Sequence, residues 1–407
     1  MFVSIQWLIY LEQWLATKEE VIEGKTTDVY FVRIEECLLG DNLDKTKVWA
    51  EVTTGGIPRD SKNLVFLGLQ DVLNLLSEAQ LPVNIYSIKE GTVLPNTDIN
   101  GVKIPFLVIE GAYGDFAIYE TPLLGLLCFQ SGVGTSALRI RKAAEDRILL
   151  SFGIRRMPPT IAPIIDRACY VAGFDGISCV LSAEKLGIEA TGTMPHAFIM
   201  IKGGIEDAMI SFDKHIDSEV SRIALADTFN DERVEVLQAL NALGDKLSGV
   251  RLDTPSSRKG SFRDIIQEIK WELKQRNRED IKIFLSGGLN EESILELKDI
   301  ADGFGIGTYV SNSPTIDFAL DIVEIESKAI AKRGKFAGRK QIGYCENCQT
   351  FLCDDFLKEE IVCQTCGKRM NKLLEKVMEN GKILSKHPTP KEIREYVLRQ
   401  KEERVEL

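Results

Sequence analysis

The hydrophobic pattern of the chain changes near residue 125. Before this point, short apolar runs rich in β-branched and aromatic residues alternate with clusters of Gly, Pro, Asn and Asp. Apolar runs bounded by turn residues are typical of β-strands. The predicted strands are Val29–Ile34, Val48–Val52, Val83–Ile88, Phe106–Ile109 and Phe116–Ile118. The pattern therefore predicts a β-rich N-terminal unit with few helices.

Between about residues 125 and 325, short apolar strands alternate with segments of helical length. The predicted strands are Ile148–Phe152, Gly176–Leu181, Gly249–Leu252, Ile281–Leu285 and Gly303–Gly307. Helices are expected over about 263–276, where Ile266, Ile269 and Leu273 share one face, and after Asn290. Alternating strands and helices predict a parallel sheet. About 200 residues is short for an eight-stranded barrel of ~250, so a doubly wound sheet remains an alternative.

The region beyond about residue 325 begins with a basic, polar stretch and ends in a charged helical tail. These changes of pattern divide the chain into four segments. We expect an N-terminal extension at 1–14, an α+β domain at 15–125, an α/β domain at 126–325 and a C-terminal segment at 326–407.

Composition and charge exclude some functional classes. The 407 residues are 44% hydrophobic and carry a net charge of −11, which argues against a general nucleic-acid binder. The longest apolar run, Leu123–Phe129, is short and contains Gly125, so no membrane span is expected. The N-terminus lacks a basic region and carries Glu12, which disfavours a secretory signal. Together with nine cysteines, this favours a cytoplasmic, reducing environment.

Four of the cysteines form two pairs of metal-ligand spacing. Cys345 and Cys348 are separated from Cys363 and Cys366 by a 14-residue loop. Two such turns supply four thiolates to one tetrahedral Zn²⁺ and leave no open position, which indicates a structural knuckle at about 343–368. Cys353 lacks a paired turn and is expected to be a spare. A nucleic-acid-binding zinc ribbon is disfavoured because the segment is acidic.

Two glycine turns follow consecutive predicted strands. The first contains Ser286, Gly287 and Gly288, and the second contains Gly305, Gly307 and Thr308. Glycine lets backbone amides approach a phosphate, and a following helix adds partial positive charge. In barrels, a phosphate site between the last two strands is a recurring arrangement. We expect one phosphate cradle here, although tight turns that only reverse the chain would have the same sequence.

Several polar side chains lie near other predicted strand ends. Arg155 and Arg156 follow the strand that ends at Phe152, and guanidinium groups there suit a pyrophosphate or a carboxylate. Arg251 and Asp253 lie on the same face of another strand end. They could orient an anionic substrate and stabilise positive charge on a sugar, or they could form a buried salt bridge.

These motifs resemble those of the nicotinate phosphoribosyltransferases, particularly the shorter archaeal and bacterial type with a four-cysteine zinc knuckle. The resemblance extends from about Gly24 to the end of the knuckle. The segments that carry it are Thr27-Asp28-Val29-Tyr30, Phe152 to Arg155, Gly192-Thr193-x-x-His196, Arg251-x-Asp253, Ser286-Gly287-Gly288 and Gly305-x-Gly307-Thr308.

The resemblance implies roles for the residues that bind the pyridine. Tyr30, in the motif with Asp28, would stack on the pyridine ring from a neighbouring subunit, and Phe152 would cover the other face. Arg155 would lie near the phosphates and the ring, and Thr193 would approach nicotinate.

It also implies the residues of the reaction centre. Arg251 and Asp253 would line the substrate site, and His196 would be the residue that ATP phosphorylates. The two glycine turns would bind the 5′-phosphate of Mg²⁺-bound phosphoribosyl pyrophosphate, with its pyrophosphate near Arg155 and Arg156.

The implied fold is an irregular α/β barrel of about seven strands with an N-terminal α+β unit to which C-terminal segments return. The implied enzyme forms nicotinate mononucleotide and pyrophosphate from nicotinate and phosphoribosyl pyrophosphate, coupled to ATP, in NAD salvage. It would be a homo-oligomer, a dimer or larger, with shared active sites. Nicotinamide or quinolinate as substrate, or a zinc-ribbon regulatory or RNA-binding protein on an inactive barrel, remain alternatives.

Overall fold

The computed structural model describes residues 14–253 and 261–404, so most of the expected extension at 1–14 lies outside the described residues. The chain divides into two compact units. The first contains the residues up to Gly132 together with Pro314–Tyr396, and the second contains Val133–Ser313 together with the residues from Val397 onward. Segments on both sides of residues 133–313 therefore build the first unit, and the second unit consists mostly of residues 133–313.

The first unit is organised around a seven-stranded sheet of order β13-β12-β1-β5-β3-β17-β18, in which every neighbouring pair is antiparallel. Its strands are β1 (Lys47–Thr54), β3 (Asn84–Ser87), β5 (Leu107–Ala112), β12 (Phe318–Ile325), β13 (Lys328–Ala329), β17 (Glu375–Glu379) and β18 (Lys382–Ile383). Trp49, Phe66, Phe106 and Phe116 are almost completely buried in its core. Strands from after residue 314 thus complete a sheet begun by the N-terminal segment.

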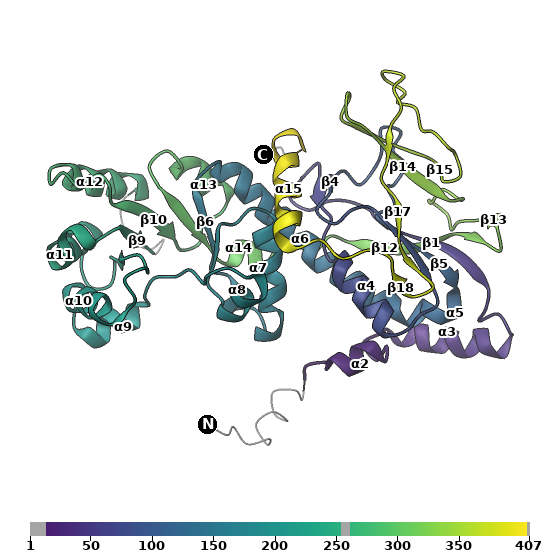
Figure 1. Ribbon diagram of the computed structural model, residues 1–407, viewed down its shortest axis with the longest axis horizontal. Coiled ribbons are helices and arrows are strands. Elements are labelled where there is room, and N and C mark those ends of the chain that lie inside the picture. Colours follow the sequence, from purple (N-terminus) through teal and green to yellow (C-terminus); the bar gives the residue numbers. More distant parts are fainter. Residues whose placement is uncertain (1–13, 254–260, 405–407) are drawn as a thin grey trace. The chain divides into compact units, whose positions relative to one another are not determined.

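Helices cover part of this sheet. They are α2 (Lys18–Ile22), α3 (Val29–Gly40), α4 (Leu69–Glu78), α5 (Tyr113–Phe116) with the 3₁₀ turn η1 (Ala117–Tyr119), and the first part of α6 (Glu120–Ala144). α3 contacts α5, and α5 contacts β5, so these elements lie together along the sheet (Figure 1). The unit is therefore α+β.

Two of the strands expected from sequence are helical. Val29–Ile34 is the first half of α3, and Phe116–Ile118 lies in α5 and η1. The β-branched residues of the first segment suggested a strand, but only Phe31 is buried in α3, so the alternating burial of a half-buried strand is absent. The following residues through Gly40 complete a helix of 12 residues, which a six-residue window could not reveal.

Two small sheets complete the first unit. β2 (Leu64–Val65) pairs with β4 (Val93–Leu94), and β14 (Lys340–Cys345) lies between β15 (Thr350–Asp355) and β16 (Asn371–Lys372). The three-stranded sheet carries the cysteine pairs on the loops at one end.

The second unit contains a six-stranded, wholly parallel sheet of order β7-β6-β11-β10-β9-β8. Its strands are β6 (Ile148–Ser151), β7 (Gly176–Ile177), β8 (Ile223–Leu225), β9 (Gly249–Leu252), β10 (Lys282–Ser286) and β11 (Gly303–Ile306). If the sheet is treated as a ring that is open between β7 and β8, its strands follow one another in chain order from β6 to β11, because β11 pairs with β6. A doubly wound sheet would instead reverse its order in the middle, so the curled α/β-barrel class is confirmed, with six strands in the described residues.

Helices surround this sheet (Figure 1). They are α7 (Ala162–Val171), α8 (Val180–Leu186), α9 (His196–Lys202), α10 (Ile205–His215), α11 (Glu232–Leu243), α12 (Phe262–Lys274), α13 (Glu291–Leu297) and α14 (Thr308–Ser311), with the 3₁₀ turns η2 (Ile154–Arg156), η3 (Pro159–Ile161) and η4 (Gly244–Lys246). The two helices expected after residues 262 and 290 are present. Because α13 has seven residues and α14 only four, a helix dipole adds little to a phosphate cradle at this point.

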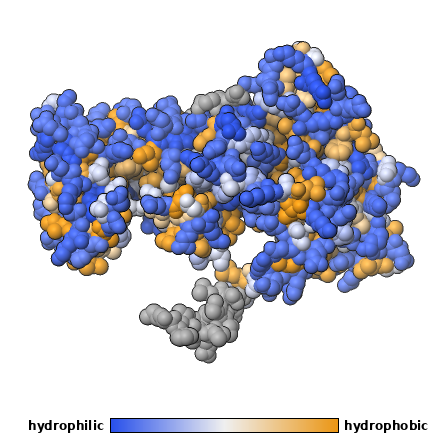
Figure 2. Space-filling model, viewed as in Figure 1, coloured by the Kyte–Doolittle hydropathy of each residue, from blue (hydrophilic) through white to orange (hydrophobic). Residues whose placement is uncertain are grey.

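Helix α6 is longer and more apolar than the sequence pattern suggested. The helical stretch Tyr113–Ala144 has a mean hydropathy of 1.3 in an 18-residue window and passes a test of length and composition for a membrane span. However, 67% of that window is buried inside the protein, as in the core helix of a globular fold. The face shown in Figure 2 is mainly hydrophilic with scattered hydrophobic residues.

Candidate active site

One cavity of about 130 Å³ lies in the second unit at the carboxyl ends of β6, β9, β10 and β11. It is lined by Phe152, Arg155, Arg156, Arg251, Asp253, Ser286, Gly287, Gly288, Gly305, Gly307 and Thr308. All eleven are among the site residues expected from sequence. The two glycine turns therefore face the same cavity, together with three arginines and one carboxylate.

The parallel pairing of β10 and β11 explains why the turns meet. Ser286 lies opposite Gly305 in the sheet register, so both chains leave the sheet at the same level. Gly287 and Gly288 then adopt φ values of +95° and +70°, which L-residues with a side chain rarely adopt. A Cβ atom at Gly305 would lie 2.4 Å from the ring of Phe152, so glycine is what lets this ring pack against the strand.

Arg251 is the centre of a hydrogen-bond network in the cavity wall. Its Nε donates to Ser286 Oγ at 2.9 Å, its Nη1 to Thr193 Oγ1 at 3.1 Å and its Nη2 to Asp253 Oδ2 at 3.1 Å. The guanidinium also lies 5.1 Å from the centre of the Phe152 ring. Ser286 Oγ in turn donates to Asp253 Oδ1 at 2.9 Å, so the Arg251–Asp253 pair is held by a third side chain. The network therefore fixes the Arg251 guanidinium and the Asp253 carboxylate in the wall of the cavity.

Asp227, which sequence reasoning missed, connects His196 to this network. Its Oδ1 lies 2.9 Å from His196 Nε2, and its Oδ2 accepts the backbone N–H of Asp253 at 2.7 Å. The Asp227 side chain is only 3% exposed, and burial raises its pKa, against the opposing effect of the hydrogen bond from His196. His196 begins α9 and its side chain is 40% exposed. The aspartate thus holds a histidine that remains open to solvent.

The remaining arginines of the cavity are free to bind a ligand. Arg155 and Arg156 lie on η2, directly after the strand that ends at Ser151, and both are exposed. Within the described residues neither has an ion pair or a hydrogen-bonding partner for its side chain. Two unpaired guanidinium groups beside a glycine cradle suit a polyanion.

Asp28 and Tyr30 belong to the first unit and do not line this cavity. Asp28 accepts a hydrogen bond from Thr121 Oγ1 at 2.9 Å, which fixes the start of α3. Tyr30 is 53% exposed and borders a separate opening of about 500 Å³ with Tyr113 and Glu120. Burial raises the pKa of Glu120 to about 7, so this opening contains a carboxyl group that titrates near neutrality.

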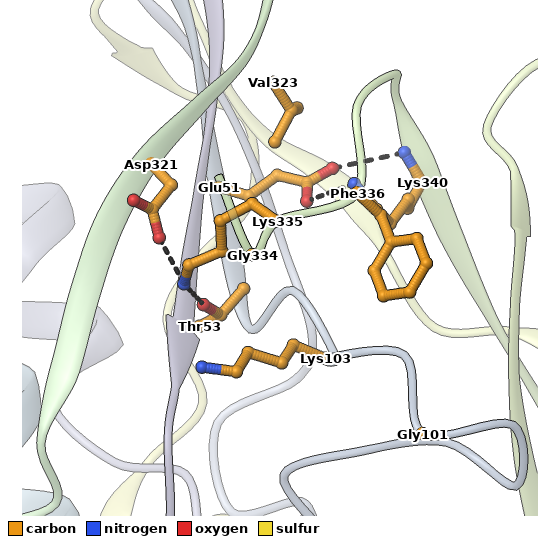
Figure 3. A pocket seen from close by; sticks show the side chains of 10 residues that line it. All are labelled: Glu51, Thr53, Gly101, Lys103, Asp321, Val323, Gly334, Lys335, Phe336 and Lys340. Carbon is orange, nitrogen blue, oxygen red and sulfur yellow. Dashed lines mark hydrogen bonds and ion pairs between the residues drawn. The ribbon is translucent and has the colours of Figure 1, made fainter. Parts of the chain in front are cut away.

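A second small cavity of the first unit, of about 80 Å³, is rich in lysine (Figure 3). Lys335 pairs with Asp321 and donates to Thr53 Oγ1 at 3.1 Å, and Lys340 pairs with Glu51 at 2.9 Å. The side chain of Lys103 forms no ion pair with a carboxylate among the described residues, and burial lowers its pKa, as does the nearby charge of Lys335. Since both acids are already paired, this cavity suits a small anion better than a cation.

The four cysteines of the C-terminal segment lie together. The sulfurs of Cys345, Cys348, Cys363 and Cys366 are all within 4.8 Å of one another. Tetrahedral Zn–S bonds of about 2.3 Å require sulfurs about 3.8 Å apart, so the cluster is of the right size for one metal ion. Cys353 lies on β15 and packs instead against the main core of the first unit, so it is not part of the cluster.

Comparison with known proteins agrees with this geometry. The family model of the quinolinate phosphoribosyl transferase N-terminal domain matches residues 28–131, and that of the C-terminal domain matches residues 133–321. A crystal structure of a nicotinate-nucleotide pyrophosphorylase from Pyrococcus furiosus is 49% identical, has a TM-score of 0.90 and covers 96% of this chain and 97% of that one.

Two further relatives are more distant. A nicotinate phosphoribosyltransferase of Mycobacterium tuberculosis is 26% identical over 89% of this chain and 83% of its own length. Human nicotinic acid phosphoribosyltransferase is 18% identical, with a TM-score of 0.74 over 92% of this chain and 93% of that one, and shows a shared fold. Both family domains occur here in the same order and almost without a gap, and relatives match along nearly the whole chain. The chain therefore belongs to the nicotinate phosphoribosyltransferase family.

Proposed function

We propose that the protein transfers the phosphoribosyl group of phosphoribosyl pyrophosphate to nicotinate, releasing pyrophosphate and forming nicotinate mononucleotide for NAD salvage. The observation that carries the proposal is the cavity in which two glycine turns, three arginines and Asp253 meet. The name of the Mycobacterium relative, a nicotinate phosphoribosyltransferase, supports nicotinate as the substrate. The name of the Pyrococcus relative, a nicotinate-nucleotide pyrophosphorylase, supports nicotinate mononucleotide and pyrophosphate as the products.

In this proposal the glycine turns bind the 5′-phosphate through backbone amides. The exposed Arg155 and Arg156 take the pyrophosphate of the Mg²⁺ complex, because paired guanidinium groups neutralise a polyanion. Mg²⁺ bound to the substrate would supply charge stabilisation to the pyrophosphate beside these arginines. The protein thereby fixes the ribose between its two anionic ends.

The reaction itself needs little covalent help from the protein. The ring nitrogen of nicotinate forms a bond to C1 of the ribose, while the bond from C1 to the pyrophosphate oxygen breaks and both electrons leave with pyrophosphate. Positive charge develops on the sugar in between, and the Asp253 carboxylate stabilises it. Arg251, held toward Thr193 by its hydrogen bond, faces the nicotinate carboxylate. Positioning and charge stabilisation then supply most of the rate.

The pyridine ring is proposed to lie between Phe152 and Tyr30 of a neighbouring subunit. Tyr30 is 53% exposed, and Val29, Val32 and Leu39 are further exposed apolar residues around α3, which a second copy of the chain would cover in part. A homo-oligomer with shared sites, in the cytoplasm, is therefore part of the proposal.

ATP coupling is proposed to act through His196. Because Nε2 is hydrogen-bonded to Asp227, we assign the proton to Nε2, which leaves a lone pair on Nδ1 to accept a phosphoryl group. His196→Ala is expected to abolish the stimulation of turnover by ATP while transfer without ATP persists, because His196 does not line the cavity. Initial rates of nicotinate mononucleotide formation with and without ATP measure this effect.

The matched control is His215→Ala, since His215 is an exposed histidine at the end of α10 in the same unit. It should retain the ATP response of the unmodified protein. Persistent ATP stimulation in His196→Ala would show that phosphoryl transfer uses another residue.

Zn²⁺ is the metal that we propose for the four-cysteine cluster. Backbone N–H groups of Cys366 and Thr365 lower the pKa of Cys363 to about 6, and thiolates are the form that binds Zn²⁺. Cys363→Ser is expected to reduce bound zinc from one equivalent to near zero and to lower the Tm, because a structural site contributes on the order of 10 kcal/mol of binding free energy. Cys37→Ser, at an exposed cysteine, should keep both values. Full zinc content in Cys363→Ser, measured by mass spectrometry of the metal, would contradict the assignment.

The decisive experiment offers phosphoribosyl pyrophosphate and Mg²⁺ with nicotinate, nicotinamide or quinolinate, with and without ATP, and follows the mononucleotide and CO₂. We expect turnover with nicotinate and none of comparable efficiency with the other two. Preferential use of quinolinate with release of CO₂, or of nicotinamide, would overturn the proposed substrate. Absence of turnover together with salt-dependent RNA binding would overturn the enzymatic function.

A further inference from the structure

Three side chains that do not line the cavity, those of Arg139, Glu291 and Tyr309, connect the segments that follow the two glycine turns. Glu291 is the first residue of α13 and directly follows the turn that contains Gly287 and Gly288. Tyr309 is the second residue of α14 and directly follows Gly307 and Thr308. Arg139 projects from α6, in the part of this helix that belongs to the second unit. None of the three lines the cavity.

Glu291 accepts hydrogen bonds from both of the other residues. Arg139 Nε donates to Glu291 Oε1 and Arg139 Nη2 to Glu291 Oε2, each at 2.7 Å, and the Tyr309 hydroxyl also donates to Glu291 Oε1. The side chains of Arg139 and Glu291 are only 13% and 15% exposed. Their charges are therefore screened little by water, unlike those of most ion pairs on the surface of a protein.

The sheet alone does not determine the distance between the turns. The register of Ser286 and Gly305 aligns the strand ends, but the chain then passes through Gly287 and Gly288 in one turn and Gly307 in the other. Glycine is the residue with the greatest backbone freedom. A cradle made of amides from two such turns needs a further constraint if the amides are to meet one phosphate at fixed positions.

A carboxylate beside a phosphate site also requires compensation. An unpaired Glu291 would repel a phosphorylated substrate bound in the adjoining turn. The bidentate pair with Arg139 neutralises this charge, and the pKa of Arg139 is raised by its hydrogen bonds to Glu291, so the guanidinium stays protonated. Arg139 thus lets an acidic side chain serve as a hydrogen-bond acceptor next to an anion site.

We propose that Glu291, paired with Arg139, is a positioning residue that holds the two phosphate-binding turns at a fixed separation through the Tyr309 hydroxyl. This inference rests on the proposed function, because it assumes that the turns bind the phosphate of a phosphorylated ribose. It assigns to these three residues a role in affinity for that phosphate, without contact to the ligand.

Tyr309→Phe tests the link with the smallest change, since it removes one hydroxyl and keeps the ring. It should weaken binding of ribose 5-phosphate, measured by calorimetry, by about three- to tenfold, the effect of one hydrogen bond. The KM for phosphoribosyl pyrophosphate should rise by a similar factor while kcat stays nearly unchanged. Amide hydrogen exchange in residues 287–290 and 307–309 should accelerate, with β9 and β10 unaffected.

Glu291→Met tests the carboxylate that both donors share, because methionine has a similar length but no oxygen that can accept a hydrogen bond. It should weaken ribose 5-phosphate binding at least as much, and Tyr309→Phe should add little further in the double variant, because both changes remove the hydrogen bond between residues 291 and 309. The matched control is Asp299→Leu, since Asp299 also accepts two hydrogen bonds from one arginine, Arg263, just beyond α13. This control should bind ribose 5-phosphate as the unmodified protein does.

The outcomes separate the two proposals. If the unmodified protein binds ribose 5-phosphate and Tyr309→Phe binds it equally well, the positioning role is wrong and the proposed function stands. A lower Tm in Tyr309→Phe with unchanged affinity would show that Arg139, Glu291 and Tyr309 stabilise the fold but do not affect phosphate binding. If the unmodified protein binds neither ribose 5-phosphate nor phosphoribosyl pyrophosphate, the proposed function fails and this inference fails with it.

Discussion

Arg251→Met is expected to lower kcat/KM for nicotinate and phosphoribosyl pyrophosphate by about 100- to 1000-fold, the usual effect of removing a preorganised charged donor from an active site. Methionine has a similar length but cannot replace the three hydrogen bonds to Thr193, Asp253 and Ser286. It also leaves Asp253 without its cation in a largely enclosed cavity wall. Steady-state kinetics with both substrates varied separately measures the loss.

The folded state of Arg251→Met should be affected much less than its activity. The side chains of Arg251 and Asp253 are 18% and 20% exposed, so solvent can partly replace the lost contacts, and we expect a cost of about 1–3 kcal/mol. Arg263→Met is the control, because Arg263 also pairs with an aspartate, Asp299, in the same unit but at the surface and outside the cavity. A kcat/KM in Arg251→Met within about threefold of that of Arg263→Met would remove Arg251 from the reaction centre.

Gly305→Ala is expected to displace the Phe152 ring and to reduce kcat/KM by about 10- to 100-fold. The added Cβ would lie 2.4 and 2.5 Å from two ring carbons of Phe152 and 3.2 Å from Ser286 Cβ. Contacts this short force neighbouring groups to move, at a cost of about 1–3 kcal/mol for an overpacked site. Because Phe152 lies against the Arg251 guanidinium, its movement disturbs the same cavity wall that we propose to orient nicotinate.

A double variant identifies the cause. In Gly305→Ala with Phe152→Leu the smaller side chain should relieve the clash, so the free energy of unfolding should fall by less than the sum of the two single changes. Gly204→Ala is the control, because a Cβ at Gly204 meets no atom within 4 Å. Additive losses in the double variant would show that the ring is not what Gly305 accommodates.

The cavity residues could be predicted from sequence because a parallel sheet brings the carboxyl ends of its strands together. All strands of such a sheet present their carboxyl ends at one edge, so motifs that follow predicted strands converge even when the strand order is unknown. The glycine turns after β10 and β11, the arginines after β6 and the Arg251–Asp253 pair of β9 all follow this rule. The strand order itself depends on the pairing of β6 with β11, elements about 150 residues apart, and no local pattern determines it.

Residues that act through distant partners were not predictable in this way. Asp227 follows β8, which has only three residues and was not among the predicted strands, so no strand end marked this aspartate as a candidate. Glu291 lies in the first turn of a helix, where acidic residues are common, and its partner Arg139 is 152 positions away, so no local pattern marks it. The helix α3 was mistaken for a strand since a run of β-branched residues near Val29 has a local preference that the tertiary structure overrides.

The interleaved layout of the first unit also has a consequence for how the chain is made. During synthesis, β1 can pair with β5 soon after both have left the ribosome, but its other neighbour, β12, follows only after residues 133–313, which form most of the second unit. Until then the backbone N–H and C=O groups on the β12 side of β1 lack their native partners, and exposed strand edges attract other chains. The six strands of the second unit are consecutive in the chain, so this sheet can form during synthesis before the sheet of the first unit is complete. Chaperone binding would be most useful in the interval before β12 pairs with β1.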